Sequence, residues 1–125
     1  MNKEATNITD ISPELKTFLK AHIHSVWQLE LITFLRNQEN PVTVSEIAKY
    51  LYSTPAAIES TLERFVQLGI IAESLGNPNS FTFSPSSMEM RQTIDDAANA
   101  YSMRRIDVIN LIFSNPQRAP RLSLE

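Results

Sequence analysis

Residues 43–83 read TVSEIAKYLYSTPAAIESTLERFVQLGIIAESLGNPNSFTF, and this stretch decides the fold. Thr43, followed three residues later by Glu46, forms a capping box, which predicts that a helix begins there. Thr54 and Pro55 then supply a cap and a proline at the first position of a second helix, 54–68. Gly69 follows, where a left-handed residue can close a helix. The spacing predicts a helix-turn-helix over 43–69.

A β-hairpin is predicted to follow directly. Residues 70–75 and 81–83 are short apolar runs, and GNPN at 76–79 between them is typical of a turn. The chain has two glycines, Gly69 and Gly76, and we expect both at positive φ. The hairpin, or wing, occupies 70–84. The predicted fold class is therefore mainly α with a small β-hairpin, a winged helix-turn-helix with extra N- and C-terminal helices.

Helices are predicted on both sides of this motif. Ser12-Pro13-Glu14 begins one, and helical spacing continues to residue 38, either unbroken or with a kink near His22. Ser86 and Glu89 form another capping box, which predicts one long terminal helix over 86–114. Val42 and Val44 suggest a very short strand. We expect a single domain over 12–116, between flexible tails at 1–11 and 117–125.

The flanking helices are apolar on more than one side, whereas a surface helix needs one apolar stripe. We therefore expect 13–38 and 86–113 to form a homodimer interface. The residues predicted at that interface are Val26, Trp27, Leu29, Tyr101, Arg105, Ile109 and Phe113.

The composition sets broad limits on the class of protein. The chain has 125 residues, enough for one ordinary core, and its 42% hydrophobic content is typical of a globular protein. It has no cysteine, which excludes disulfides and thiolate zinc sites. No apolar run approaches the roughly 20 residues of a membrane helix. The polar MNKEATNITD start predicts no signal peptide. We expect a cytoplasmic protein without membrane contact.

A winged helix-turn-helix predicts double-stranded DNA as the partner, with helix 54–68 in the major groove and the hairpin on the backbone. Phosphate contacts need Lys and Arg, yet residues 54–84 contain three glutamates and one arginine. Two functions therefore stay open: a DNA-binding regulator, or a protein-interaction module that does not bind DNA. The predicted DNA contacts are Thr54, Ala56, Glu59, Ser60, Arg64, Gln67, Asn77, Asn79 and Ser80.

The flanking segments LKTFLKAHIHSVWQLELITFL (15–35) and YSMRRIDVINLIFSNP (101–116) resemble those of small bacterial winged-helix proteins, many described as transcriptional regulators. The resemblance covers about residues 13–116. The chain is also similar, more distantly, to MarR-like regulators, in which terminal helices build a dimer. The resemblance implies a winged-helix fold and a dimer, but no ligand or operator.

Glu30 lies in an apolar run, where a carboxylate needs a partner or solvent; we expect either a pair with Arg104 or Arg105, or simple exposure. Trp27, Tyr101 and Met103 predict core or interface packing, or else a pocket for an unknown small-molecule effector; a protein effector is also open. His22 and His24 point apart on a helix, so no metal or other cofactor is expected. No catalytic constellation predicts an enzyme.

Overall fold

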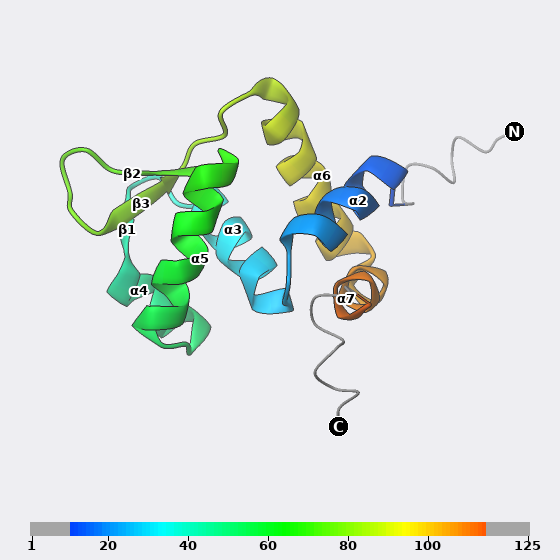
Figure 1. Ribbon diagram of the computed structural model, residues 1–125, viewed down its shortest axis with the longest axis horizontal. Helices are drawn as coiled ribbons and strands as arrows, with labels where there is room; N and C mark the ends of the chain where they lie inside the picture. Colours follow the sequence, from blue (N-terminus) through cyan, green and yellow to red (C-terminus); the bar gives the residue numbers. More distant parts are fainter. Residues whose placement is uncertain (1–10, 115–125) are drawn as a thin grey trace, which may run out of the picture. The chain divides into compact units, whose positions relative to one another are not determined.

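The computed structural model describes residues 11–114, which form six helices and three short strands within that range (Figure 1). The elements in chain order are α2 (Pro13–His22), α3 (Val26–Arg36), β1 (Val42–Thr43), α4 (Val44–Leu51), α5 (Pro55–Leu68), β2 (Ile71–Glu73), β3 (Ser80–Phe83), α6 (Met88–Met103) and α7 (Arg105–Phe113). The mainly helical, winged helix-turn-helix fold class is confirmed.

The chain divides into two compact units. The winged-helix unit comprises residues 27–91 and contains the helix-turn-helix and the hairpin. The terminal-helix unit takes the described residues on either side, 11–26 and 92–114. The predicted tails, 1–11 and 117–125, lie outside the described residues apart from Ile11.

The helix-turn-helix forms through the local signals that the sequence contains. The Thr43 hydroxyl accepts from the Glu46 amide at 3.1 Å, and the Glu46 carboxylate accepts from the Thr43 amide at 2.9 Å, which completes the capping box. Thr54 caps α5 by accepting from the Ala57 amide at 3.3 Å. Both caps satisfy amides that have no partner inside the helix. Ile47 and Ala48 of α4 are buried, as are the α5 residues Ile58, Leu62 and Phe65.

The strands form one antiparallel sheet in the order β1-β3-β2. In the hairpin, Ala72 pairs with Thr82 and Glu73 with Phe81. On the other edge of β3, Val42 pairs with Phe81, so the short strand predicted near Val42 is confirmed as part of the sheet. The loop between β2 and β3 extends away from the helices of the winged-helix unit (Figure 1). The sheet therefore holds the wing beside the helix-turn-helix.

Gly69 links α5 to the wing in two ways. Its φ of 82° is left-handed, as predicted, and its amide donates to the Val66 carbonyl at 3.0 Å. Its carbonyl accepts from the Ser86 amide at 2.8 Å, so the chain returning from the wing passes directly over it. A Cβ at this position would overlap the Ser86 side chain. Only glycine meets both demands without strain.

Two turn predictions need correction. Gly76 was expected at positive φ, but the left-handed residue of the wing is Asn79, at φ 62°. Asparagine tolerates this conformation better than most residues, so the loop does not need a glycine there. The predicted cap Ser86 instead contacts Gly69, and the hydroxyl of Ser87 accepts from the Met90 amide at 3.0 Å. Helix α6 therefore begins at Met88.

The helices outside the motif are interrupted at two places, one next to the kink predicted as an alternative near His22 and one that was not predicted. Residues 13–38 form two helices separated at 23–25. The single helix predicted over 86–114 is wrong, because Arg104, at φ −127° and ψ 52°, separates α6 from α7. In the terminal-helix unit α2 packs against α7, with Leu15, Leu19, Val108 and Ile112 buried. No helix within residues 11–114 is long and apolar enough to cross a membrane.

Candidate nucleic-acid interface

The outer face of α5 is small, polar and acidic. Four of the predicted contacts on this helix are exposed: Ala56, Glu59, Ser60 and Gln67. Thr54 is exposed at the N-terminus, where its hydroxyl caps the helix. The helix presents this face because Ile58, Leu62 and Phe65, at helical spacing, bury the opposite one. The exposed face therefore offers small and polar side chains but little positive charge.

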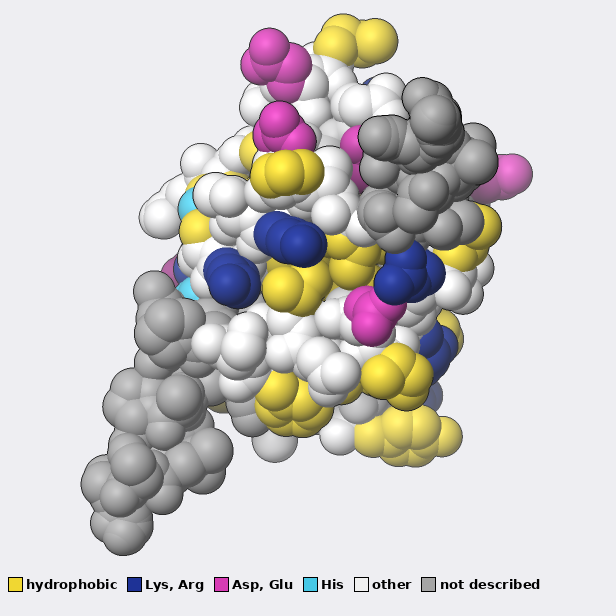
Figure 2. All heavy atoms as spheres, turned by 90° about the vertical axis from the view of Figure 1, so that its right-hand side faces the viewer, with side chains coloured by type: hydrophobic (Ala, Val, Ile, Leu, Met, Phe, Trp, Pro, Cys, Tyr) yellow, Lys and Arg dark blue, Asp and Glu magenta, His cyan; other side chains and the backbone are white. Residues whose placement is uncertain are grey.

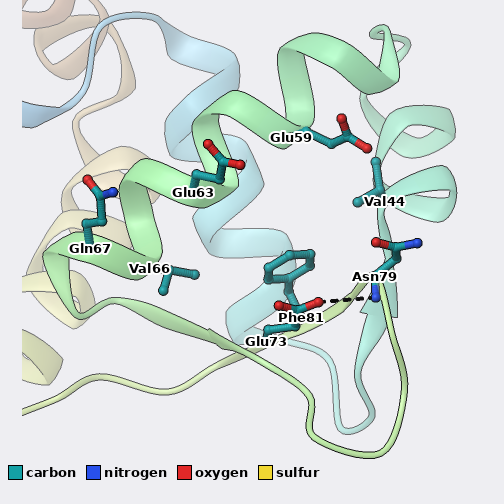
Figure 3. Close-up of a pocket in the computed structure, with 8 residues that line it drawn as sticks. All are labelled: Val44, Glu59, Glu63, Val66, Gln67, Glu73, Asn79 and Phe81. Atoms are coloured by element: carbon teal, nitrogen blue, oxygen red, sulfur yellow. Dashed lines mark hydrogen bonds between the residues drawn. The ribbon is translucent and has the colours of Figure 1, made fainter.

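A groove of about 470 Å³ separates α5 from the wing (Figure 3). Side chains of α5 line one side, and those of β2, β3, the wing loop and the start of α4 line the other. The lining combines three glutamates with apolar and amide side chains: Glu59, Glu63, Glu73, Val44, Val66, Phe81, Gln67 and Asn79. The carboxylates give the groove a negative potential, which repels phosphates.

Arg64 is the one arginine among residues 54–84, which contain no lysine, and it lies on a flank of α5. Its Nη2 donates to Oε1 of Gln28 on α3 at 2.9 Å, and its guanidinium lies 5.0 Å from the centre of the Phe65 ring. Burial lowers the pKa of Arg64 by desolvating the charged form. The cation predicted to contact DNA is thus held by a buried amide.

The wing residues have different environments. Asn77 is exposed and donates to the Ser74 hydroxyl at 3.4 Å. Asn79 is exposed, and its backbone amide donates to the Glu73 carboxylate at 3.4 Å (Figure 3). Ser80 is only 4% exposed because it pairs with Thr43 inside the sheet, so its side chain cannot contact DNA and the prediction for Ser80 is corrected.

Cations of the winged-helix unit lie outside the groove lining. Arg91 lies over the Phe83 ring, 5.6 Å from its centre, at the end of β3 away from the wing loop. Lys49 is exposed on α4. Neither residue lines the groove, so neither offsets its charge at short range.

The predicted interface residues differ in exposure. Leu29 is fully buried and Tyr101 is 8% exposed, so both serve the core of the single chain. Phe113 is exposed at the end of α7, and Arg105 lies over the Tyr101 ring at 4.5 Å. Val26, Trp27 and Ile109 are partly exposed. Met103, predicted to pack in the core or an interface or to line an effector pocket, is exposed, and so is Ile106.

Figure 2 shows the side of the molecule on which α2 and α7 lie. Apolar side chains gather in the middle and along the lower edge of this face, beside those of Lys and Arg. The large apolar residues exposed in the described part of the terminal-helix unit are Met103, Ile106 and Phe113. Such a face is typical of an interaction surface.

Several predictions stay predictions. Glu30 and the two arginines proposed to pair with it lie in different units, as do Trp27 and the other two residues of the proposed effector pocket. Within residues 11–114 no group of three or more His, Asp or Glu side chains could hold a metal ion. Sequence reasoning missed Gln28, although it shares a helical face with Leu31 and Leu35, which marks a buried position.

Comparison with solved structures identifies proteins with a similar fold. No family model and no curated protein matches the chain. It is similar to Sco5413, a MarR family transcriptional regulator from Streptomyces coelicolor, with a TM-score of 0.56 and 20% identity over 84% of this chain and 71% of that one. It is also similar to apo wild-type MarR from E. coli, with a TM-score of 0.50 and 15% identity over 98% and 93%. The chain therefore has the winged-helix fold found in MarR-type transcriptional regulators.

Proposed function

We propose that this protein is a cytoplasmic, DNA-binding transcriptional regulator that acts as a homodimer. The supporting observation is that the helix-turn-helix is capped and that its second helix, α5, is flanked by a wing. Helix α5 enters the major groove and the β2–β3 loop follows the backbone, the usual arrangement for this fold. The protein is not an enzyme on this proposal.

The acidic groove determines how DNA would be bound. With three glutamates facing the gap between α5 and the wing, few phosphates can be neutralised there. Specific binding would depend on hydrogen bonds from Ser60, Gln67 and Asn77, because amides and hydroxyls can contact both bases and phosphates. The proposal therefore predicts modest affinity and a shallow dependence on salt.

A salt series tests this function. Duplexes selected from a random-sequence pool are titrated with the protein at salt concentrations from about 50 to 200 mM. We expect sequence-specific binding that weakens with salt by less than the roughly 10³-fold seen for proteins with many phosphate contacts. If no duplex is selected, and none binds at about 50 mM salt, the regulator proposal is wrong.

The groove itself favours a second candidate, the protein-interaction module that does not bind DNA. Val66 and Phe81 supply apolar surface, and the glutamates supply charge, which together suit a Lys or Arg side chain with its apolar stem. Binding of an oligoarginine peptide without binding of any selected duplex would favour this candidate over the regulator.

A further inference from the structure

Gln28, at 9% exposed, is one of three buried polar residues within residues 11–114. It lies on α3 and accepts a hydrogen bond from Arg64, which lies 36 residues later on α5. Burying an amide without a partner costs free energy, so a buried glutamine on an apolar face needs such a bond. The bond joins α3 to one side of α5, the helix proposed to enter the major groove of DNA.

The bond to Gln28 sets the orientation of the Arg64 guanidinium as well as its position. A guanidinium is planar, so holding one amino group sets the orientation of the entire donor fork. The Phe65 ring, 5.0 Å from the guanidinium carbon, supports the same group from a second side. Arg64 remains partly exposed on the side of α5 that carries Ser60 and Gln67, one helical turn away in either direction.

We infer that Gln28 is a positioning residue, which holds Arg64 ready to donate to a phosphate of the DNA backbone. This role rests on the proposed DNA-binding function. Arg64 is the one Lys or Arg in the α5–wing segment, so its orientation controls the segment's only charge-assisted contact of this kind. Ordering a long side chain before binding removes part of the entropy cost of association.

The test is a double-mutant cycle, read by fluorescence anisotropy with a labelled random-sequence duplex of about 30 base pairs, or three helical turns. Arg64→Ala should weaken binding about tenfold at low salt and lower the salt slope by about 1. Gln28→Met keeps side-chain length but removes the acceptor, and should weaken binding about three- to fivefold. In the Arg64→Ala background, Gln28→Met should cost nothing further, because the group it positions is gone.

Two more variants separate positioning from general stability. Gln28→Glu places a carboxylate against Arg64, which competes with phosphate, so binding should fall at least as far as in Arg64→Ala while the protein stays folded. This variant also serves if Gln28→Met proves unstable. Thr33→Ala is the matched control on α3, because its hydroxyl bonds only to the Glu30 carbonyl of the same helix among the contacts described for it. Its affinity should equal that of the wild type.

The outcomes distinguish the two proposals. If wild-type protein binds DNA but Gln28→Met binds as well or better, the positioning role is wrong and the regulator function stands. Losses that add in the double mutant would lead to the same conclusion. If the wild type binds no duplex at about 50 mM salt, both proposals are wrong.

Discussion

Gly69 meets two structural requirements at one position. It closes α5 in the left-handed region and leaves room for Ser86, whose amide bonds to its carbonyl. We expect Gly69→Ala to lower the free energy of unfolding by about 1–3 kcal/mol, because both backbone strain and a steric overlap are introduced.

Urea denaturation measures this effect, and Gly76→Ala is its matched control. A Cβ at Gly76 would meet no atom within 4 Å, and the backbone there is not at positive φ. Its stability should stay within about 0.5 kcal/mol of the wild type. Equal stability of the two variants would contradict the role assigned to Gly69.

At the residue scale, the sequence predicts what is decided within one helical turn. The caps of Thr43 and Thr54 each involve partners three residues away, so the pattern is visible in the sequence. The bond between Gln28 and Arg64 spans 36 residues and depends on how two helices pack. Ser86 was misassigned for the same reason, because a contact with distant Gly69 replaced its predicted capping role.

At the element scale, α4 depends on its cap because it is only eight residues long. Such short helices are marginal without tertiary packing and satisfied ends. Thr43→Ala removes the hydroxyl that accepts from the Glu46 amide, and we expect a loss of about 1–2 kcal/mol in the free energy of unfolding.

Thermal and urea denaturation check the prediction for α4. Thr17→Ala is the control, since the Thr17 hydroxyl bonds to a carbonyl within α2 and caps no helix end. Its stability should change by no more than about 0.5 kcal/mol. A Thr43→Ala protein as stable as the Thr17→Ala protein would show that packing alone holds α4.

The groove between α5 and the wing allows a test of electrostatics at the same scale. Replacing Glu59 and Glu63 by Gln keeps size and hydrogen bonding but removes two negative charges facing the groove. If α5 binds DNA, the double variant should bind random duplex about three- to tenfold more tightly at low salt, because repulsion of phosphates falls.

Glu14→Gln, at an exposed position of α2 that does not line the groove, removes one negative charge and controls for a general charge effect; it should leave DNA affinity nearly unchanged. The interaction-module candidate predicts a different result. The double variant would then lose affinity for an oligoarginine peptide and gain none for DNA. Anisotropy with either labelled probe separates the two.

At the scale of the whole molecule, the charge is unevenly distributed. Residues 27–91 contain four Lys or Arg and seven Glu, a net charge of −3, which equals the net charge of the entire chain. The remaining residues contain seven basic and seven acidic side chains, and so are neutral. The acidity of this protein is therefore a property of its winged-helix unit, the part proposed to approach DNA.

The proposed homodimer can be tested by a substitution in the terminal helices. Ile106 is 68% exposed at the start of α7, near the apolar residues proposed for the homodimer interface. Ile106→Glu should raise the dimer dissociation constant at least about tenfold, because a buried unpaired carboxylate is costly. Analytical ultracentrifugation over a concentration series measures this constant.

Leu75→Glu is the matched control, since Leu75 is a fully exposed apolar residue on the wing. Its dissociation constant should equal that of the wild type. A wild-type protein that sediments as a monomer at every concentration would remove the dimer proposal, while leaving the fold and the groove unaffected.

The architecture was predictable where local signals repeat along the chain, and less so in the terminal helices. Apolar residues cover more than one side of 86–113, which hid the break at Arg104, because no proline or glycine marks it. The candidate site was predicted from its position in the motif. Its groove was not, because Val44, Glu63 and Phe81 come from separate elements.

The division of the chain at residues 26 and 27 has a practical consequence for spectroscopy. Trp27 is the chain's single tryptophan and the first residue of the winged-helix unit, and it is partly exposed. Its intrinsic fluorescence therefore comes from one known point, at a junction between units. Because the chain has no cysteine, a thiol-reactive dye can be attached at any chosen engineered cysteine without background labelling. Energy transfer from Trp27 to such a dye would report distances in solution directly.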